Sequence, residues 1–322
     1  MKRAVRVFLY SLAGLACLAG AAFAYLSLRK PDVAPPPAIR IEPTPERLAR
    51  GKYIAMLADC AGCHSPHDMT RFGLPVLEGQ LLAGFQFKPE NGVPGYVTAP
   101  NLTPDPETGI GAWTDGEKIR AIREGIDKDG NTLFPMMPYT RFRNLSDEDV
   151  YALVAYLNSV PPVKSAHPKT QLNFPVGLMV KFTPKPVTAP VPPPDRSNHV
   201  AYGKYLAAAG GCQDCHGENL AAANVFPFPP LKVIAANISP DRQTGIGKWT
   251  EKDFLDKFAS YRDYVAGGPP KAGPDSFTVM PWLNFAQLPD DDLRALYAYL
   301  RTLPPVKKAI ETHPGFPDRK KT

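Results

Sequence analysis

The sequence predicts an all-α protein in which two tandem domains of similar sequence follow a single N-terminal apolar helix. Three observations predict it: an uncharged apolar stretch near the N-terminus, a long internal repeat, and apolar side chains at helical spacing in both copies. With 322 residues, of which 44% are hydrophobic, the chain is long enough for two modest domains with a core each. No pair of alternating runs favours a sheet.

The N-terminal apolar segment carries no charged side chain over residues 7–28, which is long enough to cross a bilayer as a helix. Lys2, Arg3 and Arg6 precede it, so we expect a cytoplasmic N-terminus and export of the remaining chain. A cleaved secretory signal is the alternative, because Ala22-Phe23-Ala24 fits a cleavage site. We favour an uncleaved anchor in contact with lipid, since the apolar run continues past that site.

The positive charge of the chain is concentrated at the two ends of this segment. The formal net charge is +6, and residues 1–30 contain five basic and no acidic side chains. About one net positive charge remains for the rest of the chain, whereas nucleic-acid binding normally needs a basic face on a folded domain. No nucleic-acid partner is expected.

Three blocks of sequence recur in the same order. G-K-Y-I-A leading to C-A-G-C-H at 60–64 is matched by G-K-Y-L-A leading to C-Q-D-C-H at 212–216. A block ending in T-G-I-G-x-W-T follows from Asn101 and again from Asn237, and a third block begins at Phe134 and Phe277. The spacing changes only between blocks, so insertions fall in loops and each copy is a complete domain.

Proline-rich stretches separate the copies, since the 38 prolines cluster between the segments that look helical. The predicted organisation is an anchor or signal (1–30), a Pro-rich spacer (31–45), domain 1 (46–163), a Pro-rich linker (164–198), domain 2 (199–310) and a C-terminal tail (311–322). Capping residues and helical periodicity predict helices over 45–57, 115–125, 147–157, 251–261 and 289–300.

The C-x-x-C-H motif is the signature of covalent haem attachment. Two thiols one turn apart can each form a thioether on one porphyrin edge, while the adjacent imidazole reaches the iron. A zinc ribbon would need its cysteine pairs much closer together, and a thioredoxin-like dithiol would need a strand-helix-strand context. We therefore predict two covalently attached haem c groups, held by Cys60, Cys63 and His64 and by Cys212, Cys215 and His216.

The sixth iron ligand decides between a closed site, which transfers electrons, and an open one, which binds or activates small molecules. The third block offers Met137 before Pro138 and Met280 before Pro281, and methionine opposite histidine closes the site and raises the potential. Met136 aligns with Val279 and is the weaker candidate. The predicted iron ligands are therefore His64, Met137, His216 and Met280.

These motifs together resemble the class I c-type cytochrome domains, and most closely the cytochrome subunits of bacterial membrane-bound alcohol, aldehyde and gluconate dehydrogenases. The resemblance covers about residues 46–306, although those subunits carry three haem domains and this chain has two. It implies helix crossings at Gly51 with Tyr156 and at Gly203 with Tyr299. It also gives Trp113 and Trp249 a role at a haem edge or propionate, with a core position as the alternative, and Asn101 and Asn237 a propionate or a turn role.

The resemblance implies an electron carrier rather than an enzyme. It would sit in a bacterial inner membrane by one pass, with its haem domains in the periplasm. A periplasmic or membrane oxidoreductase would be the electron donor, and a cytochrome, an oxidase or another redox protein the acceptor. The alternatives are a dihaem peroxidase, a thiosulfate-oxidising cytochrome or a gas sensor, each of which needs an open or exchangeable iron site that two intact M-P motifs argue against.

Overall fold

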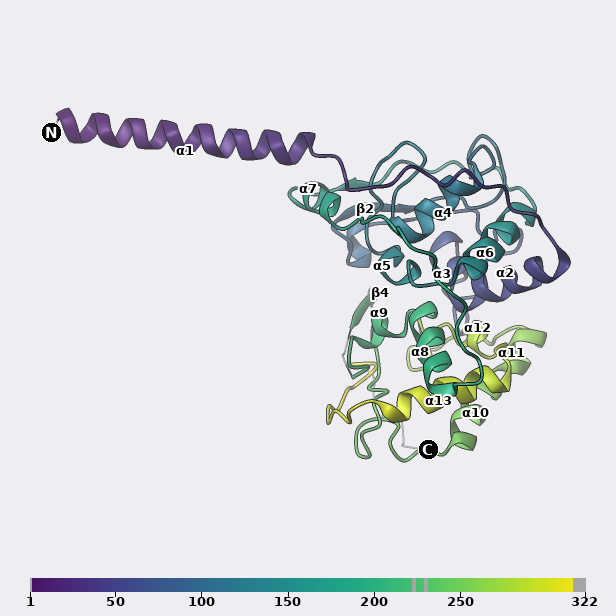
Figure 1. Ribbon diagram of the computed structural model, residues 1–322. Helices are drawn as coiled ribbons and strands as arrows, with labels where there is room; N and C mark the ends of the chain where they lie inside the picture. The colour runs from purple at the N-terminus through teal and green to yellow at the C-terminus, as the bar shows by residue number, and fades with distance from the viewer. Residues whose placement is uncertain (1, 222–223, 229–230, 315–322) are drawn as a thin grey trace.

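The computed structural model describes residues 2–221, 224–228 and 231–314 and shows a long N-terminal helix projecting from two stacked helical domains (Figure 1). Helix α1 spans Lys2–Leu28 and is long and apolar enough to cross a membrane. The helices of domain 1 are α2 (Pro45–Leu57), α3 (Cys60–His64), α4 (Asp115–Glu124), α5 (Tyr139–Phe142) and α6 (Asp147–Ser159). The helices of domain 2 are α8 (His199–Ala209), α9 (Cys212–His216), α10 (Glu251–Ala259), α11 (Arg262–Gly267), α12 (Trp282–Phe285) and α13 (Asp290–Thr302).

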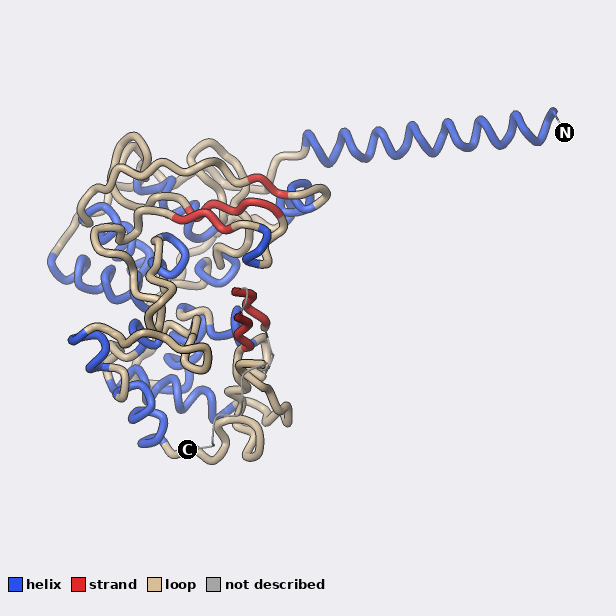
Figure 2. The backbone as a smooth tube through the Cα atoms, turned by 180° about the vertical axis from the view of Figure 1, so that it is seen from behind, coloured by secondary structure: helices blue, strands red, loops and turns tan. Residues whose placement is uncertain are grey.

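The expectation of a fold without sheets is wrong, because each domain carries a small antiparallel sheet beside its helices (Figure 2). In domain 1 the strand order is β1 (Phe85–Phe87), β2 (Gly95–Ala99) and β3 (Gln171–Leu172), and a 3-10 turn, η1 (Pro89–Asn91), joins the first two. In domain 2, β4 (Val225–Phe228) pairs with β5 (Leu231–Ile234). Strands this short show too few alternations to be distinguished from loop sequence.

The predicted helices all form, and polar caps fix where most of them begin. Thr44, Thr114 and Thr250 each accept a hydrogen bond from a backbone N–H in the first turn, and Ser146 does the same for α6. Such caps satisfy N–H groups that have no partner inside the helix. Helix α13 instead has Pro289 at its N-cap, which offers no side-chain cap, and three aspartates in its first turn that favour the positive end of the helix dipole.

Each domain is organised around the crossing of its first and last long helices, α2 with α6 and α8 with α13. A Cβ built on Gly51 would lie 1.9 Å from the carbonyl oxygen of Ala152 and 2.7 Å from Cβ of Tyr156. At the second crossing, a Cβ on Gly203 would lie 1.9 Å from the carbonyl oxygen of Ala295 and 2.9 Å from Cβ of Tyr299. Both predicted crossing pairs are confirmed, and only glycine permits so close an approach.

Replacing Gly51 or Gly203 by alanine should therefore lower the free energy of unfolding by at least about 1–3 kcal/mol, the usual cost of overpacking. The matched control is Gly267→Ala in α11, where nothing lies within 4 Å of an added Cβ. Urea unfolding followed by far-UV circular dichroism measures the difference. Equal urea midpoints for Gly51→Ala and Gly267→Ala would contradict this, because they would mean that the crossing helices move apart at little cost in free energy.

The segment 164–198, predicted to be a linker, lies against domain 1 over much of its length. His167 Nε2 is 2.9 Å from the carbonyl oxygen of Ala83, and β3 pairs with β2. The short helices α7 (Val176–Met179) and η2 (Val180–Phe182) follow, and Val180 is buried. The predicted tail over 311–322 lies largely outside the described residues.

The two domains share one continuous hydrophobic cluster, so the expectation of a separate core for each is wrong. Leu57 at the end of α2 and Leu206 in α8 belong to the same cluster and are at most 1% exposed. A Cβ on Gly210 would lie 3.4 Å from Cδ1 of Leu57, which shows how closely the ends of α2 and α8 approach. The repeat thus folds as two domains joined by an extensive interface.

Candidate functional site

The two C-x-x-C-H motifs form the short helices α3 and α9, and each starts from the same unusual backbone geometry. The residue before the first cysteine has a left-handed conformation in both domains, at Asp59 (φ 49°) and at Gly211 (φ 64°). Glycine adopts this conformation freely and aspartate is one of the few other residues that tolerate it. The turn redirects the chain so that a long helix is followed at once by the cysteine pair.

The imidazoles of His64 and His216 are buried and held in one orientation by the backbone. Nδ1 of His64 lies 2.7 Å from the carbonyl oxygen of Pro100, and Nδ1 of His216 lies 2.7 Å from that of Ala236. A proton on Nδ1 donated to the carbonyl leaves Nε2 as a lone-pair donor for a metal. Burial lowers the pKa of His64 to about 4 and also lowers that of His216. Both rings are therefore neutral at pH 7, the form that binds iron.

The four motif cysteines are half-buried. Burial raises the pKa of Cys60, Cys63 and Cys212 to about 12 and that of Cys215 to about 11. A redox-active dithiol needs a lowered pKa to form its thiolate, so these pairs do not suit disulfide exchange. Within the described part of the chain, no group of three or more His, Cys, Asp or Glu side chains could hold a metal ion. The donor set thus fits thioether attachment of haem with one axial imidazole.

The methionines of the two M-P motifs occupy equivalent positions in the two domains. Tyr139 N donates to the carbonyl oxygen of Met137 at 2.8 Å, and Trp282 N to that of Met280 at 2.7 Å, immediately before α5 and α12. Both side chains are half-buried and pack against the shared hydrophobic cluster, as Cys60 and Cys212 do. Met136 is half-buried too but is not among the described side chains packed there. Met137 and Met280 as iron ligands stay a prediction that this packing favours.

Trp113 and Trp249 are half-buried and pack against the same cluster, so their position at a haem edge also stays a prediction. Asn101 and Asn237, by contrast, have a turn role, because their side-chain oxygens accept from the backbone N–H of Thr103 and of Ser239, at 2.9 Å each. The amide nitrogen of Asn101 donates to Thr108 Oγ1 and to the carbonyl oxygen of Val163, at 3.2 and 2.7 Å. Asn237 makes the equivalent bonds to Thr244 and Val306, at 3.1 and 2.8 Å. Both amide hydrogens are occupied, which leaves no donor for a propionate.

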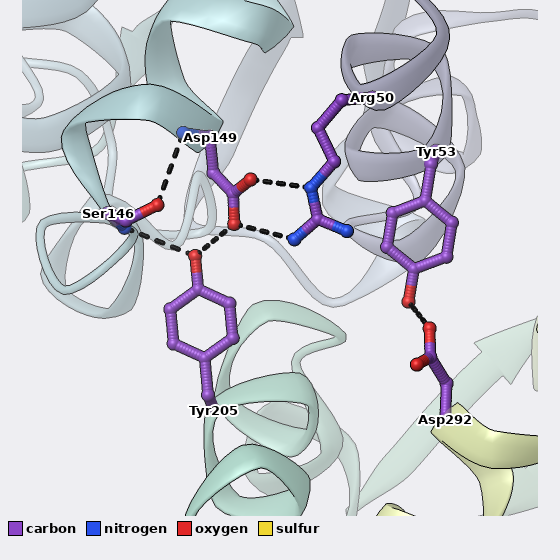
Figure 3. Close-up of polar contacts among 6 residues, drawn as sticks. All are labelled: Arg50, Tyr53, Ser146, Asp149, Tyr205 and Asp292. Carbon is purple, nitrogen blue, oxygen red and sulfur yellow. Dashed lines mark hydrogen bonds and ion pairs between the residues drawn. The ribbon is translucent and has the colours of Figure 1, made fainter. Parts of the chain in front are cut away.

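The interface between the domains is reciprocal, because equivalent residues of the repeat contact one another in both directions (Figure 3). Tyr205 of α8 donates to the Asp149 carboxylate of α6 at 2.5 Å. Tyr53 of α2, the repeat partner of Tyr205, donates to Asp292 of α13, the repeat partner of Asp149. Such an arrangement is that of a two-fold symmetric dimer, here formed within one chain.

Among the described residues, only one of the two carboxylates in this network forms an ion pair. Arg50 donates from Nε and Nη2 to the two oxygens of Asp149, at 2.6 and 2.8 Å, as a bidentate pair. Burial disfavours the charge of Arg50, but the hydrogen bonds and charge of Asp149 outweigh it, so the pKa of Arg50 is raised. The repeat places Tyr202 where Arg50 stands, so Asp292 has tyrosines around it and pairs with no guanidinium among the described residues.

A second pair of contacts brings each domain to the haem-attachment motif of the other, with donors that are repeat partners and acceptors that are not. Arg141 of α5 donates to Asp214, between the cysteines of α9, at 2.5 Å. Its repeat partner Asn284 of α12 donates to Asp59, next to Cys60, at 2.7 Å. Burial raises the pKa of Asp59 to about 7, although Gly62 N–H and Asn284 oppose the shift. Both motifs therefore lie against the interface, each beside a polar side chain of the opposite domain.

The interface residues were not identified from the sequence. A signal was nevertheless present in the repeat: Tyr53 and Tyr205 align, as do Asp149 and Asp292, although nothing in the helical pattern requires them. Polar residues preserved in both copies on the outer face of a helix point to a contact that both copies make. The pattern could have indicated a symmetric interface but not which helices meet.

Comparison with known proteins agrees with the geometry. The family model for cytochrome c matches residues 48–161 and again 200–304. The cytochrome c subunit of a quinone alcohol dehydrogenase of Gluconobacter oxydans (strain 621H) is 32% identical over 285 residues, covering 80% of this chain and 55% of that protein. The fructose dehydrogenase cytochrome subunit of Gluconobacter japonicus is 32% identical over 294 residues, covering 85% of this chain and 57% of its own length.

A shorter relative matches along most of its length. The dihaem cytochrome c-type protein of Cereibacter sphaeroides is 29% identical over 274 residues, which cover 80% of this chain and 86% of that protein. The chain spans just over half the length of the dehydrogenase cytochrome subunits that it matches. The two-domain repeat is thus similar to part of those subunits and to nearly all of the smaller protein.

Proposed function

The chain belongs to the cytochrome c family, and we propose that it is an electron relay that takes single electrons from a dehydrogenase and passes them to a downstream redox acceptor. Each of its two cytochrome c domains contains one complete C-x-x-C-H motif, and the chain carries two covalently bound haem c groups. Haem c supplies an iron that cycles between the ferric and ferrous states. The observation that carries the proposal is the repetition of one complete donor set, a buried oriented imidazole and an M-P turn, in both domains.

We infer that the chain's own residues close both irons. Backbone carbonyls hold His64 and His216 in a neutral form with Nε2 free. Met137 and Met280, in the M-P turns before α5 and α12, would supply the second axial ligand of each iron. Trp113 and Trp249 would shield a haem edge. A thioether sulfur is a neutral, soft ligand that favours ferrous iron, which suits an electron acceptor.

The interface supports relay within the chain. Arg141 with Asp214 and Asn284 with Asp59 tie each C-x-x-C-H motif to the opposite domain, so the two attachment sites are held at a fixed relation. Separate domains on a flexible linker would vary that relation and therefore the rate of transfer between haems. We propose that the shared core keeps the two haems in one arrangement.

The partner and the location follow from the relatives and from α1. Several relatives are cytochrome subunits of dehydrogenases, so we propose that an oxidoreductase of this class is the electron donor. Helix α1 would anchor the chain in a bacterial inner membrane by a single pass, with the haem domains in the periplasm. A cytochrome or an oxidase would accept the electrons.

Reductive titration tests the relay directly. The purified holoprotein should take up two electrons per chain in one-electron steps, with two haem c groups by pyridine haemochrome assay. It should also show no turnover of hydrogen peroxide or thiosulfate, which a dihaem enzyme with an open iron would show. Steady peroxide turnover by the wild-type protein would favour the enzyme instead.

A further inference from the structure

The segment 174–182 presents large apolar side chains to the surface next to the base of α1. Phe174 is 76% exposed and Met179 63%, which makes them the two most exposed large hydrophobic side chains among the described residues outside α1. Phe182 is 45% exposed. Scattered single apolar residues on a surface are ordinary, but three within nine residues are not.

This segment makes three contacts with the last turns of α1 and the residue that follows them, and Figure 1 shows α7 beside that end of the helix. The rings of Phe174 and Phe23 have centroids 6.4 Å apart. Lys181 Nζ donates to the carbonyl oxygen of Ser27 at 2.7 Å, which satisfies a group left unpaired at the helix end. The Arg29 guanidinium carbon lies 4.4 Å from the ring centroid of Phe182.

These contacts fix the depth of the segment relative to α1. Phe23 precedes the last apolar residue, Leu28, by about 7 Å along the axis at 1.5 Å per residue. The ring of Phe174 is therefore level with an apolar part of the helix, whereas Phe182 is level with the first charged residue after it. The apolar ring of Phe174 would thus lie at the depth of the acyl chains, and the basic side chain of Arg29 at the depth of the headgroups. This order matches the boundary of a bilayer.

We propose that residues 174–182 form a second membrane contact, in which Phe174 and Met179 enter the acyl boundary of the bilayer that α1 crosses. The proposal rests on the proposed anchoring by α1, because the depth is measured from that helix. A phospholipid surface fits better than a protein partner, since the patch is continuous with the apolar end of α1. The net charge near this patch also favours a lipid surface. Residues 25–32 and 174–186 contain four basic side chains and one acidic side chain, which suits anionic headgroups.

A second contact changes how the haem domains sit on the membrane. An anchor followed by a Pro-rich spacer would leave them free to swing, whereas attachment at both α1 and the segment 174–182 fixes one face toward the bilayer. The segment directly follows β3, which pairs with β2 of domain 1, and its Val180 is buried, so a fixed orientation of the segment also orients that domain. The membrane contact would thus present the same surface to redox partners at all times.

Thiol accessibility in the full-length holoprotein tests the proposal. Met179→Cys and the control Val265→Cys, an exposed apolar residue of α11, are each placed in a Cys17→Ala background and reconstituted into nanodiscs containing phosphatidylglycerol. The four motif cysteines are held as thioethers and do not react. Cys at 179 should react with a water-soluble maleimide at least about tenfold more slowly than Cys at 265, since an apolar environment suppresses the thiolate. Equal rates would overturn the proposal, as would protection that appears only after a dehydrogenase is added.

A second experiment tests the lipid contact of residues 174–182 separately from anchoring by α1. If N-terminal sequencing shows that the protein starts at Tyr25, α1 is a cleaved signal and the anchoring proposal fails. The mature protein is then floated with phosphatidylglycerol vesicles beside a Phe174→Ser/Met179→Ser variant, whose haem spectrum reports intact folding. Flotation that the double variant loses would support the lipid contact without the anchor, and failure of the wild type to float would overturn it.

Discussion

Replacing Asp149 by alanine should lower the free energy of unfolding by about 3 kcal/mol or more, because it leaves the Arg50 guanidinium at the interface without its partner. The Asp149 side chain is 6% exposed and that of Arg50 23%, and two hydrogen bonds join them. The substitution also removes the acceptor of Tyr205, so the hydrogen bond between Tyr205 and Asp149 is lost together with the ion pair. Urea unfolding of the holoprotein, followed by circular dichroism and by Soret absorbance, measures the loss.

The preceding residue on the same helix is the matched control. Glu148 pairs with Arg47 at 3.1 Å, but its side chain is 65% exposed, so Glu148→Ala should cost less than about 1 kcal/mol. Asp292→Ala should fall between the two variants, since Asp292 is buried but pairs with no arginine in the described part of the chain. Equal losses for Asp149→Ala and Glu148→Ala would mean that the interface network does not hold the domains together.

Replacing Met137 or Met280 by alanine should open one iron and leave the other closed. Each variant should gain one high-spin ferric haem per chain, bind carbon monoxide rapidly at one ferrous site, and show one potential lowered by on the order of 100 mV, within the ~0.8 V that axial ligands span. Met136→Ala is the control and should leave both haems low-spin. A Met136 variant that opened a site while Met137→Ala did not would reverse the ligand assignment in domain 1.

The sequence was sufficient for features that depend on local pattern. Ser146 and the acidic residues after it predict where α6 begins, and the glycine at each helix crossing follows from the resemblance to class I domains. The sheets could not be predicted, because β1 has three residues and β3 has two, and β3 pairs with β2 from outside the predicted domain boundary. Pairing of this kind depends on tertiary contacts and leaves no periodic signal.

The interface between the domains is the largest feature that could not be predicted from the sequence. Tyr53 and Asp292 lie in different copies of the repeat, and each is a common residue on its own helix. Their contact depends on how two folded domains dock, which proline content and helical period do not describe. The density of prolines in 164–198 suggested a linker between independent units, whereas buried contacts between α2, α5, α8 and α12 decide the arrangement.

The spin state of the wild-type ferric protein at neutral pH tests the central claim most directly. If His64 with Met137 and His216 with Met280 close the two irons, electron paramagnetic resonance should show two low-spin haems per chain and no high-spin signal. A high-spin signal that integrates to one haem per chain would mean that one iron is open, and it would contradict the assignment of this chain as an electron relay.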